Sequence, residues 1–329
     1  MGVYQFRHLG IGPPKRSDGG QNVYNTPAMR KYQKVLIIVG PTSSGKSTLA
    51  VELARKFNGE VVSADSRQVY RDLNIGTGKI TKREMKGVPH YLLDIASPKK
   101  TFTAHDFVQK GRAVIRNIAA RNKLPIICGG TGFYIDALVG RIMLPNVPAD
   151  SKLRTQLEKR SAVQLFAILK RRDPRRARTI DRHNKRRLIR ALEIARYQGP
   201  SLVIPRTVLG NPYDTLWIGI ALPEKQLEKK IAVRLFSRIS RGMGAEAKKL
   251  HAAGLSYKRM EELGLEYRSL ARLLQGKITR TQMIEELNRS IRKYAKRQLV
   301  YWKRNKNIVW FKDPKTPRIS RTVRSWLKK

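Results

Sequence analysis

Residues 35–48 read VLIIVGPTSSGKST, and this stretch decides the expected fold. The apolar run at its start is typical of a buried strand, and Gly40 to Ser47 match the pattern G-x-x-x-x-G-K-[ST]. Helix-forming residues, TLAVELARKF, follow. Strand, glycine loop and helix in this order predict a phosphate-binding loop, in which backbone N–H groups and the helix dipole face an anion. The alternative is a glycine turn that merely joins a strand to a helix.

Specific residues of this loop are expected to contact phosphate. Lys46 would reach the terminal phosphates, and the Ser47 hydroxyl would hold Mg²⁺. The full set of expected phosphate ligands is Gly40, Thr42, Ser43, Ser44, Gly45, Lys46, Ser47 and Thr48. The motif predicts a ligand with adjacent phosphates, and it does not distinguish a nucleotide from another diphosphate.

Further apolar runs predict the rest of an α/β core. Strands are expected at 60–63 and 124–128, with a helix over 104–121 between them, and later strands at 216–222 and 308–311. Alternation of strands with helices of this length indicates a doubly wound parallel sheet. The predicted fold is therefore α/β, a P-loop NTPase-like parallel sheet flanked by helices, with an all-helical insertion domain.

Changes of composition along the chain predict its domains. Residues 151–190 hold 15 Lys or Arg against three acids and follow a helix-capping signal, which indicates a basic helical insertion. The expected organisation is a flexible basic tail at 1–33, a P-loop α/β core with C-terminal helices at 34–143 and 208–312, a helical insertion at 144–207, and a basic tail at 313–329.

Composition limits the class of partner. The chain has 329 residues, with 69 Lys plus Arg against 24 Asp plus Glu and a formal net charge of +45, which implies a polyanion such as nucleic acid. No apolar run approaches the roughly 18 residues of a spanning helix, so a membrane partner is not expected. Cys128 is the single cysteine, which excludes an internal disulfide and a cysteine zinc cluster and fits the cytoplasm.

Two stretches that leave predicted strands carry candidate chemistry. SADSRQVY, residues 63–70, follows the second strand, and ligands of an open parallel sheet lie beyond the strand ends. Asp65 could accept a proton or hold Mg²⁺ through water, or it could simply cap a turn. GGTGFY, residues 129–134, brings the Thr131 hydroxyl to the same edge, where a helix N-cap is the alternative.

Basic side chains on predicted helices are candidates for phosphate contact. Arg187 and Arg190 lie in RHNKRRLIRALE, and Lys296 and Arg297 lie among the aromatic residues of YAKRQLVYWKR. Charge runs are usually solvated faces, but the overall excess favours contact with nucleic acid phosphates. Arg234, in KKIAVRLFSRI, is either an arginine that extends from a core helix to solvent or a phosphate ligand.

Several motifs together resemble one enzyme family. They are GPTSSGKST (40–48), SADSRQVYRDLNIGTGK (63–79), PHYLLD (89–94), GGTGFYIDAL (129–138), RRLIRALE (186–193), the helix with Arg234, GLEYRSL (264–270) and AKRQLVYW (295–302). In this order they resemble the tRNA dimethylallyltransferases, also called tRNA isopentenyltransferases, of the bacterial type. The resemblance spans about residues 35 to 312.

The resemblance implies an activity and roles for individual residues. It implies transfer of a dimethylallyl group from dimethylallyl diphosphate to N6 of the adenine 3′-adjacent to the anticodon, position 37, with Mg²⁺ as cofactor, by a monomer. It implies Asp65 as general base, Thr131 orienting the reacting groups, and Arg234 with Lys46 on the diphosphate. The residues implied to contact the anticodon stem-loop of tRNA are Asp65, Ser66, Arg67, Gln68, Thr131, Arg154, Arg186, Arg187, Arg190, Lys296, Arg297 and Gln298.

Two other functions are compatible with part of the pattern. A small-molecule kinase of the P-loop class would consume ATP and would not need RNA. A non-catalytic RNA-binding protein would carry a vestigial phosphate-binding loop, although the intact Lys46, Ser47, Asp65 and Thr131 argue against such decay.

Overall fold

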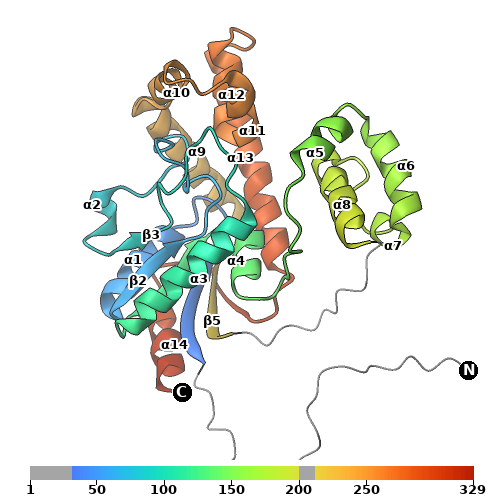
Figure 1. The fold of residues 1–329 in the computed structure, drawn as a ribbon. Coiled ribbons are helices and arrows are strands. Elements are labelled where there is room, and N and C mark those ends of the chain that lie inside the picture. Colours follow the sequence, from blue (N-terminus) through green and yellow to red (C-terminus); the bar gives the residue numbers. More distant parts are fainter. Residues whose placement is uncertain (1–31, 200–211) are drawn as a thin grey trace, which may run out of the picture. The chain divides into compact units, whose positions relative to one another are not determined.

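In the computed structural model, which describes residues 32–199 and 212–329, the strands form one parallel sheet in the order β3-β2-β4-β1-β5-β6 (Figure 1). The strands are β1 (Gln33–Val39), β2 (Gly59–Ser63), β3 (His90–Tyr91), β4 (Leu124–Gly129), β5 (Tyr213–Ile220) and β6 (Ile308–Phe311). Every pairing between neighbouring strands is parallel. The α/β fold predicted from the sequence is therefore confirmed.

Strand β1 lies between β4 and β5 and is buried on both faces by the two apolar clusters of the sheet. Its residues Val35, Leu36, Ile37, Ile38 and Val39 are all 0% exposed. Successive side chains of a strand point to opposite faces, so residues 36 and 38 enter one apolar cluster while 35, 37 and 39 enter the other. A continuous apolar run is the sequence pattern that such a central parallel strand requires.

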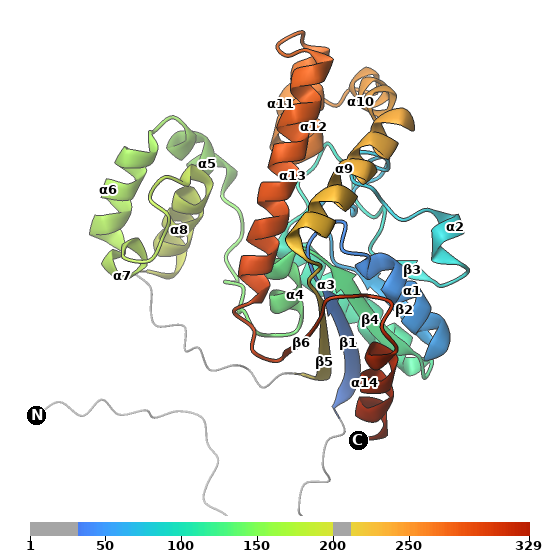
Figure 2. The same cartoon turned by 180° about the vertical axis from the view of Figure 1, so that it is seen from behind.

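Helices cover both faces of the sheet (Figures 1 and 2). The helices outside the insertion are α1 (Lys46–Lys56), α2 (Lys82–Met85), α3 (Ala104–Ala120), α4 (Gly132–Leu138), α9 (Glu224–Ser240), α10 (Met243–Ala252), α11 (Tyr257–Leu263), α12 (Leu265–Leu274), α13 (Arg280–Trp302) and α14 (Pro317–Lys328). Apolar residues of α3 and α4 form the cluster on one face. Residues of α1, α9 to α13 and α14 form the cluster on the other.

Most predicted elements begin and end close to their expected residues. Helix α3 begins after Thr103, whose hydroxyl accepts a hydrogen bond from the backbone N–H of Asp106 while the Asp106 carboxylate accepts one from Thr103. This capping box is a local signal in the sequence. Strand β5 differs more, because Tyr213 and Asp214 pair with β1 and extend the strand three residues before its predicted start. The short β3 and α2 were not predicted.

The chain between α4 and β5 forms helices with an apolar core of their own. The helices are α5 (Ser151–Glu158), α6 (Ala162–Arg172), α7 (Pro174–Ala177) and α8 (Lys185–Gln198), and their core includes Leu165, Leu169, Leu188 and Leu192. The helical character expected for 144–207 is therefore present up to residue 198. Residues 200–211 lie outside the described residues, so the second boundary of the insertion stays a prediction.

The two expected tails have different outcomes. Residues 1–31 of the N-terminal tail lie outside the described residues, and Gln33 already belongs to β1. The prediction of a basic tail at 313–329 was wrong for most of that segment, which forms α14. Ile319 and Val323 are 1% and 0% exposed and pack in the core, and the Trp326 indole N–H donates to Asp214 on β5 at 3.0 Å. Ile319 and Val323, four positions apart, lie on one face of the helix and pack it against the core together with Trp326 and Leu327.

One carboxylate is buried at the start of β2 and fully paired. Glu60 is 0% exposed and accepts two hydrogen bonds from the Arg121 guanidinium at 2.6 and 2.7 Å, one from Lys123 at 2.9 Å, and one from the Tyr91 hydroxyl at 2.8 Å. Hydrogen bonds from Arg121 are the main reason that the pKa of Glu60 is lowered to about 2, against the opposing effect of burial. The cluster ties β2 and β3 to the end of α3.

We expect Glu60→Gln to lower the free energy of unfolding at neutral pH by about 1–3 kcal/mol, because Arg121, Lys123 and Tyr91 lose a buried, charged acceptor. The folded-state pKa lies below the ordinary value of 4.5, so the stabilisation is complete above that pH and is lost as pH falls toward 2. Urea unfolding of both proteins over a pH series measures the difference. Glu228→Gln, which removes an exposed ion pair with Arg292, is the control and should change stability little. A gap between wild type and Glu60→Gln that stays constant down to pH 2 would contradict this account.

Candidate active site

The predicted phosphate-binding loop joins β1 to α1. Gly45 is the N-cap of α1 and has φ of +89°, a conformation that favours glycine, and Ser43 also has positive φ at 62°. The loop therefore curls directly into the first turn of the helix, where backbone N–H groups lack carbonyl partners within the helix. The Lys46 ammonium donates to the Pro41 carbonyl at 3.0 Å and lies back across the loop. This is the geometry of an anion cradle.

Lys46 shares its surroundings with another cation. Burial lowers the pKa of Lys46, and the nearby Arg234 guanidinium adds to that effect. Burial likewise lowers the pKa of Arg234, with Arg238 as the next cause. Buried cations placed together are costly unless an anion accompanies them. The site is therefore electrostatically suited to a multiply charged anion.

A cavity of about 360 Å³ brings together ten of the predicted site residues. The loop contributes Thr42, Lys46 and Ser47 to its lining, and α9 contributes Arg234. The remaining predicted residues that line it are Asp65, Ser66, Arg67, Gln68, Arg297 and Gln298. The end of β2, the phosphate-binding loop, α9 and α13 thus converge on one space beyond the carboxyl ends of the strands, where ligands of parallel sheets bind.

Asp65 caps a turn with one of its carboxylate oxygens, which is one of the roles that the sequence left open. Its Oδ1 accepts hydrogen bonds from the backbone N–H groups of Arg67 at 2.8 Å and Gln68 at 3.3 Å, which caps the turn after β2. In the part of the chain that the structure describes, Oδ2 accepts no hydrogen bond. One oxygen therefore holds the turn, and the other remains available in the cavity for a proton or a cation.

Thr131 supports this turn from the neighbouring strand end. Its Oγ1 accepts a hydrogen bond from the Ser66 backbone N–H at 3.1 Å. Thr131 occupies the N-cap position of α4, but its side chain makes no capping hydrogen bond there. It does not line the cavity in this structure and is therefore placed to orient the turn that carries Asp65. Nearby on α13, burial raises the pKa of Tyr294 to about 12, with the Asp65 charge as the second cause.

Gln298 joins the phosphate-binding loop to the loop after β4. It is 6% exposed, its Oε1 accepts from the Thr42 backbone N–H at 2.9 Å, and its Nε2 donates to the Gly130 carbonyl at 3.0 Å. Gln298 therefore fixes the cradle from α13. The tRNA contact implied for it stays a prediction.

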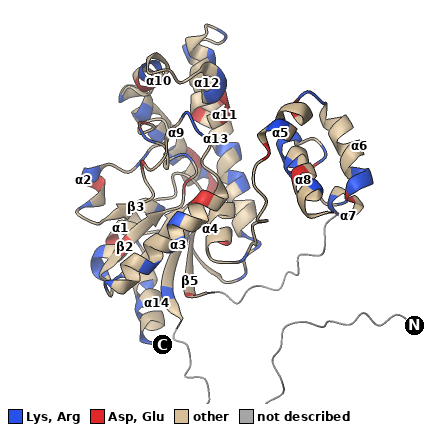
Figure 3. Ribbon diagram, in the orientation of Figure 1, with Lys and Arg blue, Asp and Glu red and all other residues tan. Residues whose placement is uncertain are grey.

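The basic residues of the insertion fall into two groups. Arg154 and Arg190 both bond the Glu193 carboxylate, which is 1% exposed, and Arg190 also donates to the Val147 carbonyl, so they hold the insertion together. Arg186 and Arg187 are exposed on α8. These four residues do not line the cavity, and their contact with tRNA stays a prediction. Figure 3 shows Lys and Arg spread over the insertion and along α13, where Lys296 is exposed.

The structure adds Arg238 to the cavity, which sequence reasoning missed. Arg238 is 7% exposed, donates to Glu266 at 2.8 Å, and its Nε has no partner among residues 32–199 and 212–329. Its position four residues after Arg234, on the same face of α9, was the sequence signal that could have identified it.

No cluster of three His, Cys, Asp or Glu suited to a metal occurs in the described residues. None of the described helices is long and apolar enough to cross a membrane.

Comparison with known proteins identifies relatives over most of the chain. The family model described as IPP transferase matches residues 68–306. A tRNA dimethylallyltransferase of Caldanaerobacter subterraneus subsp. tengcongensis is 37% identical over 287 residues, covering 84% of this chain and 91% of that protein. The tRNA dimethylallyltransferase of Leuconostoc citreum is 38% identical over 298 residues, covering 89% of this chain and 99% of that protein.

Solved structures agree with these relatives. The tRNA isopentenylpyrophosphate transferase from Bacillus halodurans superposes with a TM-score of 0.68 at 35% identity, covering 90% of this chain and 97% of that one. A eukaryotic dimethylallyltransferase acting on tRNA superposes with a TM-score of 0.73 at 26% identity, covering 88% of this chain and 78% of that one. The extent and agreement of these matches confirm the resemblance seen in the motifs, and the chain belongs to the tRNA dimethylallyltransferase family, whose members are also described as IPP transferases.

Proposed function

We propose that this protein transfers a dimethylallyl group from dimethylallyl diphosphate to N6 of adenine 37 in tRNA, next to the anticodon, and releases diphosphate. The observation that carries this proposal is the shared cavity of Lys46, Arg234 and Asp65. A cavity lined by two cations that suit a diphosphate, and by a carboxylate that could accept a proton, supports this reaction. Both parts come from one chain, so we also propose that a monomer is sufficient.

The phosphate side of the cavity favours departure of diphosphate. When the bond between the dimethylallyl carbon and the diphosphate oxygen breaks, negative charge increases on that oxygen and spreads over the diphosphate. Lys46, Arg234 and the N–H groups of the loop are already in place before the charge develops, so they stabilise it without reorganisation. Their burial strengthens the effect because little water competes for them.

The carboxylate side favours attack by the adenine amine. The lone pair of N6 is delocalised into the ring, so the neutral amine is a weak nucleophile. As the bond from N6 to the dimethylallyl carbon forms, the nitrogen loses a proton, which the free Oδ2 of Asp65 accepts. The adenine must leave its stack to reach the cavity, which costs a few kcal/mol that contacts elsewhere on tRNA offset.

The residues present also fit Mg²⁺. The Ser47 hydroxyl and the Asp65 carboxylate line the cavity, and hydroxyl and carboxylate oxygens are the hard donors that this ion prefers. Ser47 would hold the ion directly and Asp65 through water. Bound there, Mg²⁺ would neutralise part of the charge on the diphosphate.

The proposed activity has a direct test. The protein is incubated with unmodified tRNA, dimethylallyl diphosphate and Mg²⁺, and the anticodon-loop fragment is examined by mass spectrometry for one dimethylallyl group on adenine 37. A parallel reaction with ATP in place of dimethylallyl diphosphate tests the kinase alternative. ATP consumption without any mass gain on tRNA would overturn the proposal, and tight tRNA binding with neither reaction would favour the non-catalytic alternative.

For tRNA recognition we expect Arg187→Ala to weaken tRNA binding a few-fold and to reduce the slope of log affinity against log salt by about one. Arg187 is exposed on α8 and has no ion-pair partner in the described residues, so its charge is available to a phosphate. Affinities at several salt concentrations measure the slope. Arg55→Ala, which removes an exposed arginine from α1, is the matched control. An unchanged slope for Arg187→Ala would mean that this side chain does not contact phosphate.

A further inference from the structure

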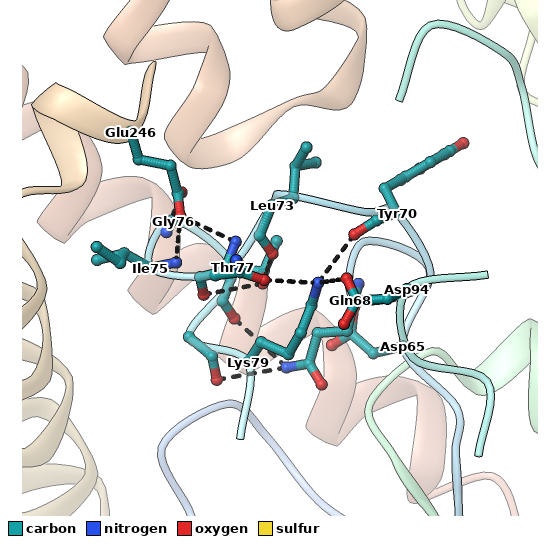
Figure 4. Close-up of polar contacts among 12 residues, drawn as sticks. Asp65, Gln68, Tyr70, Leu73, Ile75, Gly76, Thr77, Lys79, Asp94 and Glu246 are labelled. Carbon is teal, nitrogen blue, oxygen red and sulfur yellow. Dashed lines mark hydrogen bonds and ion pairs between the residues drawn. The ribbon is translucent and has the colours of Figure 1, made fainter. Parts of the chain in front are cut away.

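Residues 73–79, here called the 73–79 loop, belong to the segment that connects β2 to α2. This loop passes beside the cavity. A single carboxylate from α10 holds one side of it (Figure 4). Glu246 accepts hydrogen bonds from the consecutive backbone N–H groups of Asn74 at 3.0 Å, Ile75 at 2.7 Å and Gly76 at 2.9 Å. It accepts a fourth from the Tyr267 hydroxyl at 2.7 Å. A carboxylate with four donors is strongly held, and so is the backbone that supplies three of them.

The carbonyl groups of the same loop face the cations of the cavity. The Gly78 carbonyl accepts from Arg234 at 2.8 Å, and the Gly76 carbonyl accepts from Arg238 at 2.7 Å. The amide of Gln68 lies against the Thr77 and Gly78 carbonyls at 3.4 and 3.5 Å. Three cavity side chains thus take their positions from the carbonyl groups of one short loop.

The fit between the loop and α12 leaves little freedom for another arrangement. A Cβ on Gly76 would lie 2.7 Å from the ring of Tyr267, which is 1% exposed. The backbone therefore packs directly on that ring, with Glu246 bonded to both. A shift of the loop away from Glu246 would displace the carbonyl groups that hold Arg234 and Arg238.

We propose that Glu246 is a positioning residue for diphosphate binding, which acts through the 73–79 loop to hold Arg234 in the cavity. Its carboxylate fixes the backbone from Asn74 to Gly76, and so holds in place the peptide groups that follow, whose Gly76 and Gly78 carbonyl oxygens accept from Arg238 and Arg234. Without it, Arg234 would sample several orientations, and part of the binding energy of diphosphate would be spent on ordering it. This inference rests on the proposed function, because it assigns Arg234 to the diphosphate.

The test is a double-mutant cycle with inorganic diphosphate and Mg²⁺ as the probe. We expect Glu246→Gln to weaken diphosphate binding by about tenfold in the wild-type background and to have little further effect in Arg234→Ala, because coupled residues are not additive. In turnover, the KM for dimethylallyl diphosphate should rise while the KM for tRNA stays near its wild-type value. A residue that only stabilised the fold would change both KM values or neither.

Two further variants control for stability. Tyr267→Phe removes one of the four donors to Glu246 and keeps its three backbone bonds, so we expect a smaller loss of diphosphate affinity, about two- to threefold, again absent in Arg234→Ala. Glu286→Gln removes a half-exposed pair with Arg272 on α12 and α13 that does not touch the 73–79 loop, and it should bind diphosphate like wild type. Melting temperatures of all variants are measured alongside.

The outcomes separate this inference from the proposed function. Unchanged diphosphate affinity in Glu246→Gln overturns the inference, as does an equal loss in the wild-type and Arg234→Ala backgrounds. If Glu246→Gln does not fold, the Tyr267→Phe cycle decides by the same criterion. Failure of the wild-type protein to prenylate tRNA would instead overturn the proposed function, and the diphosphate cycle, which needs no turnover, would still decide whether Glu246 positions Arg234.

Discussion

Replacing Asp65 with asparagine is expected to lower the rate of prenyl transfer to tRNA by about 10²- to 10⁴-fold, the usual contribution of a general base. Asparagine keeps an oxygen that can accept from the Arg67 and Gln68 N–H groups, so the turn after β2 should persist. It has no carboxylate to accept the proton of N6. Single-turnover transfer rates and equilibrium tRNA binding, measured on the same preparations, test the prediction.

The companion variant Asp65→Ala separates the two functions of this side chain. It should lose transfer to a similar extent and also lower the free energy of unfolding by about 1 kcal/mol, because the turn loses its capping acceptor. In Asp65→Asn, stability and tRNA affinity should both stay near wild type. Near-normal transfer by Asp65→Asn would exclude a role as base, and equal losses of rate and tRNA affinity would indicate a binding role instead.

Replacing Lys46 with alanine is expected to reduce kcat/KM for dimethylallyl diphosphate by about 10²- to 10³-fold, because a preorganised cation is removed from the position where negative charge develops. Burial lowers the pKa of Lys46, so its charged form is disfavoured in the free protein, and a bound anion would offset this cost. The melting temperature of ligand-free Lys46→Ala should therefore equal or exceed that of wild type.

The matched control for this variant is Lys56→Ala, at the exposed far end of the same helix, which should leave transfer unchanged. Steady-state kinetics with each substrate varied in turn measure both effects. The KM for tRNA should change little in Lys46→Ala, since the lysine lies beneath the phosphate side of the cavity. Undiminished affinity of Lys46→Ala for inorganic diphosphate would contradict the assignment of the loop as a diphosphate cradle.

Several features of the fold could be predicted because they depend on neighbouring residues. The apolar run of β1, the glycine loop and the start of α1 follow one another within residues 33–46, and local backbone preferences and side-chain periodicity determine them. The helix over 104–121 was predicted for the same reason. The two-residue β3 is too short for a recognisable pattern. The segment of α14 was interpreted as a tail because its charged residues outnumber the apolar residues that pack against the core.

The structure brings part of the predicted site together and shows local contacts for other members of it, while the roles assigned to all of them stay predictions. Asp65, Lys46 and Arg234 share a cavity, as the motifs implied. Arg154 and Arg190, by contrast, are bonded to Glu193, which lies 39 and 3 positions away in the chain. A basic run has the same appearance in sequence whether its arginines hold a buried carboxylate or face solvent.

Residue order alone therefore established a phosphate-binding loop on a parallel α/β sheet, a carboxylate at the next strand end, and a polyanionic partner. Packing established the connections between them. Gln298 reaches the phosphate-binding loop across 256 positions of the chain, and Glu246 reaches Ile75 across 171. Such hydrogen bonds depend on which faces of distant helices meet after folding, and local periodicity contains no information about that choice.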